Sequence, residues 1–193
     1  MAGKMSYMLV KGFMKTIFRI EIRGVQNLPQ EGGCMVCANH LSMWDPVLLT
    51  CFMPRKISFI AKAELKKVPF VGGVLKGCDT IFIKRNSSDL GAIKLSMKAI
   101  EDGKVIGIFP TGTREKNDPN AKPKSGAALI AAKTGATVVP VAIKATYKIF
   151  SKVVVTIGEP MDYSECKGKK VPSEQLETMV GQIYDKIIEI KSC

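Results

Sequence analysis

The chain of 193 residues is 46% apolar and 24% charged, a composition that fits one globular domain with a sizeable core and excludes a disordered or fibrous protein. Its formal net charge of +12 is large for this length and predicts an acidic partner: a nucleic acid, an anionic membrane surface or a phosphorylated small molecule. No stretch approaches the roughly 20 consecutive apolar residues that a membrane-spanning helix needs.

The N-terminal segment has the pattern of a basic amphipathic helix. Apolar side chains recur through residues 7–18, and Lys11, Lys15 and Arg19 follow at a spacing of four, which would place the three cations on one stripe of a helix. Helices of this kind lie in membrane interfaces. We therefore expect a membrane-interface helix over 1–16, with an ordinary surface helix packed on the core as the alternative.

Seven apolar, β-branched runs recur along the chain at intervals too long for hairpins. Several are continuously apolar, which is typical of strands that are covered on both faces of a sheet. The predicted strands are 17–24, 33–39, 56–62, 79–85, 104–110, 136–143 and 152–158.

Helical patterns alternate with these strands. Gly103 and Gly135 directly follow two of them, in the position where glycine commonly ends a helix. The alternation predicts a single α/β domain over 17–193, with a mixed, largely parallel sheet flanked by helices. The predicted helices are 46–52, 70–76, one from Ser87 or Ser88 to 102, 125–134 and 173–190.

Six cysteines include one C-x-x-C pair, Cys34 and Cys37, inside a predicted strand. Positions i and i+3 of a strand point to opposite faces, so these two side chains could not easily share a metal ion, and no second pair lies nearby. The chain also shows no secretory signal peptide. We expect reduced, mostly buried cysteines, no metal site and a cytoplasmic location.

The stretch "NHLSMWDP" contains the only histidine, His40, followed five residues later by Asp45. The preceding strand would deliver His40 to the carboxyl edge of the sheet, and Asp45 and Pro46 suit the cap and first position of a helix. Two interpretations are open at this point. The pair is either a loop histidine with a capping aspartate, or a base whose imidazole takes a proton from an attacking hydroxyl while the carboxylate fixes its tautomer.

Basic side chains also gather at the ends of predicted strands. Arg114 lies in the glycine-containing loop "FPTGTRE", Lys84 and Arg85 end the run "IFIKR", and Lys124 precedes a predicted helix. Backbone N–H groups in such a loop, a guanidinium and a helix N-terminus all favour phosphate. Because ligands of open α/β sheets bind at the carboxyl ends of strands, we expect a phosphate site near His40.

In their order along the chain these motifs resemble those of the glycerolipid acyltransferases, especially the bacterial 1-acyl-sn-glycerol-3-phosphate (lysophosphatidate) acyltransferases. "NHLSMWD" is similar to the family's N-H-x-x-x-x-D, with His40 and Asp45 at the defining positions. "GCDTIFIKR" resembles the second block, ending in Arg85, "FPTGTRE" the third, F-P-E-G-T-R, and "VVPVAI", with Pro140, the fourth. The resemblance covers most of the chain. It departs at Thr111, where the family usually has Glu.

The resemblance implies transfer of a fatty acyl group from a thioester, acyl-CoA or acyl carrier protein, to the sn-2 hydroxyl of lysophosphatidate, forming phosphatidate in phospholipid biosynthesis. His40 would deprotonate that hydroxyl and Asp45 would hold His40. The acceptor phosphate would be bound by the basic side chains of Arg85, Arg114, Lys84 and Lys124. The loop of Thr111, Gly112 and Thr113 would contact the acceptor and the oxyanion. No cofactor, metal or covalent intermediate is implied, and the chain has no G-x-S-x-G motif.

The N-terminal helix would then dock the enzyme on the cytoplasmic face of an anionic membrane as a peripheral, monotopic protein. Two other functions stay open. Thr111 leaves room for a different acceptor, glycerol 3-phosphate or another lysophospholipid. The charge of +12 leaves room for nucleic-acid binding, although the 8 Phe, 4 Tyr and 1 Trp mostly lie in apolar runs rather than among basic residues.

Overall fold

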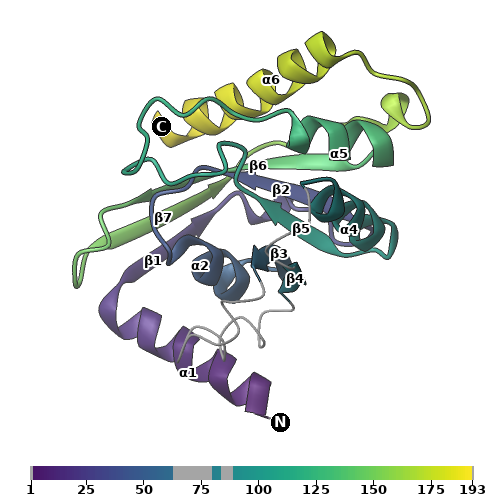
Figure 1. Cartoon of the computed structure of the whole chain (residues 1–193). Helices are drawn as coiled ribbons and strands as arrows, with labels where there is room; N and C mark the ends of the chain where they lie inside the picture. Colours follow the sequence, from purple (N-terminus) through teal and green to yellow (C-terminus); the bar gives the residue numbers. More distant parts are fainter. Residues whose placement is uncertain (1, 63–79, 84–88, 193) are drawn as a thin grey trace.

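The computed structural model describes residues 2–62, 80–83 and 89–192, and the strands in this part of the chain form one sheet (Figure 1). The order across the sheet is β1-β7-β6-β2-β5-β3-β4. The strands are β1 (Arg19–Arg23), β2 (Cys34–Ala38), β3 (Ile57–Lys62), β4 (Ile81–Ile83), β5 (Val105–Ile108), β6 (Thr137–Ala145) and β7 (Lys152–Ile157).

Helices cover both faces of this sheet. One face carries α1 (Ala2–Ile17) and α2 (Asp45–Phe52), and the other carries α4 (Asp89–Glu101), α5 (Gly126–Thr134) and α6 (Ser173–Ser192) (Figure 1). Two short 3-10 turns, Val25–Asn27 and Ser164–Cys166, lie in the connections. The predicted single α/β domain with a mixed, largely parallel sheet is confirmed.

All neighbouring strands are parallel except β6 and β7, which are antiparallel. The reason lies in the connections, because parallel strands need a crossover of a dozen residues or more, whereas only residues 146–151 join β6 to β7. The carboxyl ends of β2, β5 and β6 therefore share one edge of the sheet with the start of β7 and of β1. This edge is where His40 and the loop after β5 emerge.

The buried side chains form two clusters, one on each face of the sheet. All of β2 is buried, with Cys34 in the cluster under α1 and α2 and Cys37 in the cluster under α4, α5 and α6. The prediction that these two thiols point to opposite faces is confirmed, and both are free thiols. Burial raises the pKa of Cys37 to about 12, which keeps it protonated and unreactive.

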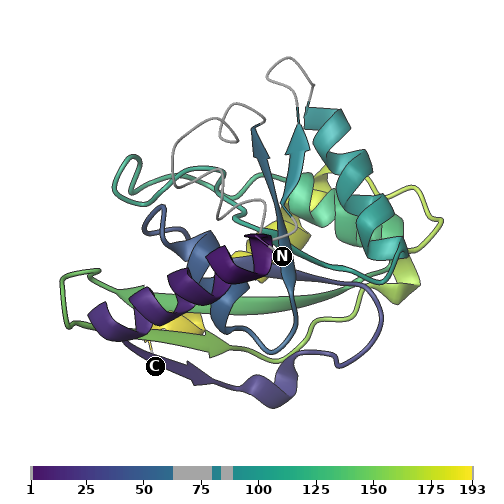
Figure 2. The same cartoon turned by 90° about the horizontal axis from the view of Figure 1, so that it is seen from below.

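Helix α1 packs on the core through one side only. Val10, Met14 and the following Phe18 are buried, and the ring of Trp44 lies 6.5 Å from that of the exposed Phe13. Seen from below, α1 crosses the sheet beside α2 (Figure 2). None of the described helices is long and apolar enough to cross a membrane.

The predicted stripe of three cations on this helix is wrong. The helix ends at Ile17, so Lys11 and Lys15 lie in α1 at a spacing of four, but Arg19 belongs to β1. The reason is that residues 19–23 pair with β7, which removes them from the helical register. The ammonium of Lys11 lies 5.4 Å from the centre of the Phe52 ring.

The other helices begin and end close to the predicted residues. Gly103 and Gly135 adopt positive φ angles of 79° and 66° after α4 and α5, the left-handed conformation that favours glycine. The predicted helix over 70–76, and Ser87 and Ser88 as caps of α4, lie outside the described residues.

Candidate active site

Asn39 fixes the backbone that presents His40. Its buried side chain accepts a hydrogen bond from Ile143 N at 2.7 Å and donates one to Ile143 O at 3.0 Å, which extends the pairing of β2 with β6 past the end of β2. The carbonyl of His40 accepts a further bond from Glu115 N at 2.8 Å. The histidine therefore leaves the sheet in a defined direction.

His40 and Asp45 contact each other directly. His40 Nδ1 lies 2.8 Å from Asp45 Oδ2, which also accepts from Leu41 N at 2.6 Å and Ser42 N at 2.7 Å. The Asp45 side chain is wholly buried, whereas that of His40 is 17% exposed. An ionised carboxylate only accepts hydrogen bonds, so Nδ1 carries the proton and Nε2 of the neutral ring is left as an acceptor.

The prediction that Asp45 caps the helix is wrong. Asp45 is the first residue of α2, and Trp44 occupies the cap position without a side-chain hydrogen bond. The carboxylate points back to the amides of Leu41 and Ser42 instead of forward to the first turn of α2. In this orientation Asp45 Oδ2 faces three donors, the two amides and the imidazole. A carboxylate that capped the helix would point away from them.

Phe109 holds the imidazole from one side. The rings of His40 and Phe109 are stacked, with centres 4.0 Å apart and planes at 14°, and the ring of Phe59 stacks behind Phe109 at 5.3 Å. Phe109 directly follows β5, and Glu115, which bonds the backbone of His40, ends the same loop. Both ends of the loop 109–115 thus contact the histidine, Phe109 through its ring and Glu115 through its backbone N–H.

The loop itself is tightly closed. Gly112 has a φ of 69°, and its N–H donates to Phe109 O at 2.9 Å, while Thr111 Oγ1 donates to Thr113 O at 2.9 Å. Lys124 N donates to Pro110 O, and its side chain crosses Gly112 so closely that a Cβ there would lie 3.5 Å from Lys124 Nζ. Four of the predicted site residues, Thr111, Gly112, Thr113 and Lys124, are therefore neighbours.

Arg114 follows in the same loop and is half-buried. Its neighbour Glu115 pairs with Lys191 of α6 at 2.8 Å and accepts from Asn39 at 3.3 Å. Among the described residues no hydrogen bond or ion pair involves the guanidinium of Arg114 or the ammonium of Lys124. Both cations are thus available to an anionic ligand, while Lys84 and Arg85 lie outside the described residues.

Tyr147 is a site residue that the sequence analysis missed. Its hydroxyl donates to Asp45 Oδ1, the carboxylate oxygen that does not face His40. The two residues are 102 positions apart, and Tyr147 lies in the β6–β7 turn outside every motif. No sequence signal links them, because the contact depends on the antiparallel return of β7.

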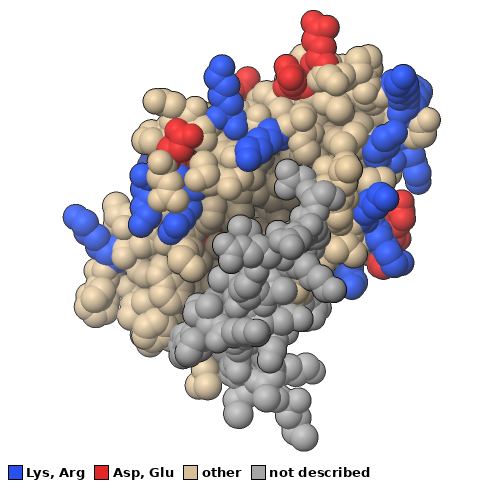
Figure 3. All heavy atoms as spheres, in the orientation of Figure 1, with Lys and Arg blue, Asp and Glu red and all other residues tan. Residues whose placement is uncertain are grey.

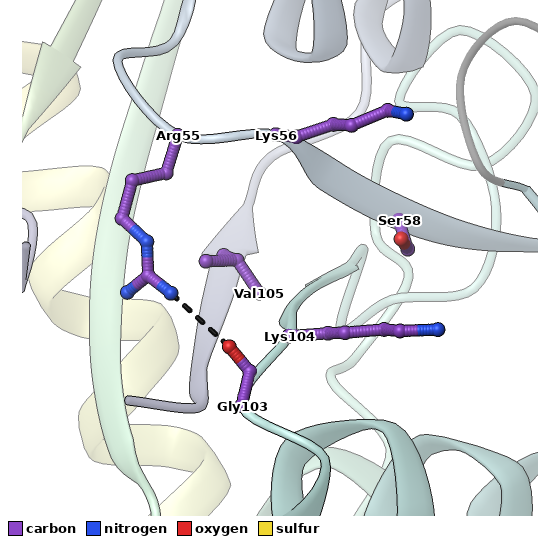
Figure 4. Close-up of a pocket in the computed structure, with 6 residues that line it drawn as sticks. All are labelled: Arg55, Lys56, Ser58, Gly103, Lys104 and Val105. Carbon is purple, nitrogen blue, oxygen red and sulfur yellow. Dashed lines mark hydrogen bonds between the residues drawn. The ribbon is translucent and has the colours of Figure 1, made fainter. Parts of the chain in front are cut away.

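A basic cavity of about 270 Å³ lies at the other edge of the sheet, where β3 and β5 begin (Figure 4). The guanidinium of Arg55 donates to the carbonyls of Pro29, Gly32 and Gly103 there, and so holds two loops together. The cavity is therefore separate from the dyad. Its lining residues are Arg55, Lys56, Ser58, Gly103, Lys104 and Val105. In the described part of the chain no three His, Cys, Asp or Glu side chains gather as a metal site would require.

Comparisons with known proteins show the family of the chain and its fold. The acyltransferase family model matches residues 19–144. The 1-acyl-sn-glycerol-3-phosphate acyltransferase of Borreliella burgdorferi is 31% identical over 139 residues, 71% of this chain and 56% of that protein. That of Bacillus subtilis is 28% identical over 182 residues, 90% of this chain and 88% of that protein. This chain thus spans only a little over half the length of the first relative.

Among solved structures, the chain resembles the crystal structure of the 1-acyl-sn-glycerophosphate (LPA) acyltransferase PlsC from Thermotoga maritima. The TM-score is 0.70 at 26% identity, over 100% of this chain and 79% of that chain. The family match runs from the start of β1 almost to the end of β6 and includes His40, Asp45 and the loop of Arg114. The chain therefore belongs to the acyltransferase family.

Proposed function

We propose that this protein transfers a fatty acyl group from acyl-CoA or acyl carrier protein to the sn-2 hydroxyl of 1-acyl-sn-glycerol-3-phosphate, forming phosphatidate for phospholipid synthesis. The observation that carries the proposal is the direct contact of 2.8 Å between His40 Nδ1 and Asp45 Oδ2. The cations of Arg114 and Lys124, which form no ion pair with the residues that the structure describes, support it. So do the relatives named as 1-acyl-sn-glycerol-3-phosphate acyltransferases.

In the proposed reaction His40 acts as a general base. Nε2 takes the proton of the acceptor hydroxyl as its oxygen attacks the thioester carbonyl. When the tetrahedral intermediate collapses, the C–S bond breaks and the thiolate takes the proton back from the imidazolium. Asp45 stabilises the imidazolium in between, and a positioned base of this kind contributes about 10²–10⁴ in rate. The acyl donor is a substrate, and the scheme needs no cofactor, metal or covalent enzyme intermediate.

We assign the acceptor phosphate to Arg114 and Lys124, with Lys84 and Arg85 as further ligands. Charge-assisted hydrogen bonds from Arg and Lys suit a phosphate. Figure 3 shows Lys and Arg side chains at several places on one face of the molecule, with Asp and Glu side chains between some of them. Because the N–H of Gly112 is bonded to Phe109 O, the oxyanion is left to the next amides, those of Thr113 and Arg114.

The acceptor remains the open choice within this reaction, because Thr111 replaces the Glu that the family usually has. Its hydroxyl is turned into its own loop, toward Thr113 O, and adds no negative charge beside Arg114. Glycerol 3-phosphate or another lysophospholipid is therefore the second candidate acceptor.

An assay with a panel of acceptors tests the proposed acceptor and the second candidate. Purified protein receives lysophosphatidate, glycerol 3-phosphate or lysophosphatidylcholine with acyl-CoA and with acyl carrier protein, and products are identified by mass spectrometry. We expect phosphatidate from lysophosphatidate, abolished in His40→Ala with the fold retained. Absence of turnover of lysophosphatidate with both donors would rule out the proposed acceptor, and wild-type rates in His40→Ala would rule out the base.

We further propose that α1 rests in the interface of an anionic membrane, on its cytoplasmic face. While Val10 and Met14 pack on the core, Met8 is 71% exposed, Leu9 68% and Phe13 49%. Large apolar side chains exposed together on a helix, with the cation of Lys15 beside them, fit the boundary between headgroups and acyl chains. The lipid acceptor and product would then be reached without leaving the membrane surface.

A further inference from the structure

Each oxygen of the Asp45 carboxylate has its own partners. Oδ2 accepts from His40, Leu41 and Ser42, whereas Oδ1 accepts from the hydroxyl of Tyr147 and from no other group of the described residues. Since the carboxylate is wholly buried, loss of the tyrosine hydroxyl would leave Oδ1 with no donor from the residues that the structure describes.

The fold maintains this contact against a backbone preference. Tyr147 has a φ of 53°, a left-handed conformation that is unfavourable for a non-glycine residue. Its ring packs edge-on against Phe18, with ring centres 5.5 Å apart and planes at 81°. Burial first, and the charge of Asp45 second, raise the pKa of Tyr147 far above its usual range, so the hydroxyl keeps its proton and remains a donor.

We propose that Tyr147 is a positioning residue of the acyl-transfer site, whose hydroxyl holds Asp45 Oδ1 so that Oδ2 faces His40 and draws part of the carboxylate charge away from the imidazole. The inference rests on the proposed role of His40 as the base. A base must be neutral to accept a proton, and an unshared carboxylate favours the protonated imidazolium more strongly than a shared one.

Among the described residues, Tyr147 and Asp45 are the groups that we expect to set the protonation equilibrium of the His40 imidazole. Glu115, on the loop that bonds His40 O, is paired with Lys191 from α6. Arg114 on the same loop, and Lys124 beside it, are cations assigned to the acceptor phosphate. The ring stacked on His40 is Phe109, which carries no charge.

The test uses the fact that the chain has a single histidine, so an imidazole titration followed by NMR reports His40 alone. Tyr147→Phe keeps the ring against Phe18 and removes only the hydroxyl. We expect the midpoint of the titration to rise by about half a pH unit or more, because the imidazolium gains stability. The acidic limb of the kcat/KM profile should move by the same amount. At neutral pH, kcat should fall roughly tenfold, with the KM for lysophosphatidate nearly unchanged.

A second variant keeps the hydroxyl of Tyr147 and should shift the midpoint of the His40 titration in the opposite direction. Growth on 3-fluorotyrosine replaces all 4 tyrosines with a more acidic phenol, which donates more strongly and should lower the midpoint. Tyr163→Phe is the matched control, because its buried hydroxyl has no hydrogen-bond partner among the described residues and lies in the cluster on the other face of the sheet. This control should titrate and turn over as wild type.

An unchanged midpoint in both Tyr147→Phe and the fluorotyrosine protein would overturn the positioning role and leave the acyl-transfer proposal intact. Full activity of His40→Ala would instead remove the proposed function, whatever the titration shows. A lower kcat without any change of the pH profile would assign Tyr147 a purely structural role and would also overturn the inference.

A separate observation concerns the tip of the same turn. Ile149 is 72% and Phe150 68% exposed, and they are adjacent in sequence with the exposed Lys148 beside them. Phe150 N donates to Ile17 O at 2.7 Å, so the tip is attached to the carboxyl end of α1, as Figure 2 also shows. Arg19, exposed and basic, continues the chain from that end and donates its N–H to Ser151 O.

We infer that Ile149 and Phe150 enter an anionic lipid surface as a second contact beside α1. Two neighbouring large apolar side chains exposed at a turn, with Lys148 and Arg19 beside them, match the apolar and charged layers of such a surface. Burying one large apolar side chain strengthens binding by roughly tenfold or more.

The experiment is sedimentation with vesicles of phosphatidylglycerol and phosphatidylcholine. The double variant Ile149→Ser, Phe150→Ser should bind at least tenfold more weakly than wild type, while Leu90→Ser, Leu95→Ser should bind equally well. This control removes two exposed leucines, 63% and 40% exposed, from α4 on the other face of the sheet. Equal binding of the tip variant and the control would overturn the inference.

Discussion

The carboxylate of Asp45 gathers four donors around one buried negative charge, and the imidazole of His40 is only one of them. Two backbone amides, from Leu41 and Ser42, come from the loop between the dyad residues. The short spacing between His40 and Asp45 is therefore part of the site, because it lets the chain fold back onto its own carboxylate.

Asp45→Asn tests that arrangement. An amide in place of the carboxylate would oppose its NH₂ group to some of these donors and would no longer stabilise an imidazolium. We expect kcat to fall by about 10²–10⁴ and the midpoint of the His40 titration to fall as well, because a neighbouring negative charge is lost. Steady-state rates and NMR measure the two effects, and a rate within a few fold of wild type would contradict the dyad.

Arg114 is expected to act on binding. Arg114→Ala should raise the KM for lysophosphatidate at least tenfold, because a charge-assisted bond to phosphate is lost, while Lys116→Ala, an exposed change two residues further on, should leave it unchanged. Substrate titrations at fixed acyl donor would show the difference. The same rise in both variants would point to general charge attraction instead of a specific phosphate contact.

Single residues were predictable where the chemistry is local. Spacing and residue type made His40, Asp45 and the loop of Arg114 candidates, and only the order of the motifs, through the family resemblance, favoured a base over a loop histidine. They were not enough to distinguish a helix cap from a carboxylate turned backward, since both place Asp beside Pro46. The sequence did not predict Tyr147, because its partner Asp45 is remote in sequence and because a tyrosine gives no sign of a positive φ.

Among the elements, α1 has a buried side and an exposed side, and the membrane contact proposed for the exposed side can be tested separately from the packing of the buried one. Met14 is fully buried, so Met14→Ala should lower the free energy of unfolding by about 2–5 kcal/mol. Leu9→Ser with Phe13→Ser should leave stability nearly unchanged and weaken sedimentation with anionic vesicles at least tenfold, because these side chains are exposed in the free protein. Urea denaturation and vesicle sedimentation measure the two quantities, and loss of both in either variant would contradict the division.

Arg55 stabilises the far edge of the sheet by binding carbonyls of the loop before β2 and of the turn after α4. Arg55→Lys keeps the charge and loses the forked donor set, so we expect a loss of about 2 kcal/mol and a lower Tm by roughly 4–8 °C. Activity at 25 °C should remain near that of wild type, as in Lys104→Ala. A specific loss of acyl transfer with unchanged Tm would place a function in the basic cavity.

For the whole molecule, the alternation of apolar runs and helical patterns predicted the seven strands and the class of sheet. It did not predict the strand order or the antiparallel pairing of β6 with β7. The strand order and this pairing depend on which connection is short enough to form a turn. Residues 144–151 contain the end of β6 as well as the turn, so the sequence did not show where β6 ends. The helix over 1–16 was predicted, but not which of its apolar side chains the core would bury.

The reversal of β7 and β1 against the other strands has a consequence for how a lipid approaches. It brings the end of α1, the tip of the β6–β7 turn and the loops of the dyad to one edge of the sheet. In the proposed reaction a lysolipid can therefore present its headgroup to His40 while its tail stays among neighbouring lipids. The enzyme would not have to extract its acceptor, and the product would already lie in the leaflet that uses it.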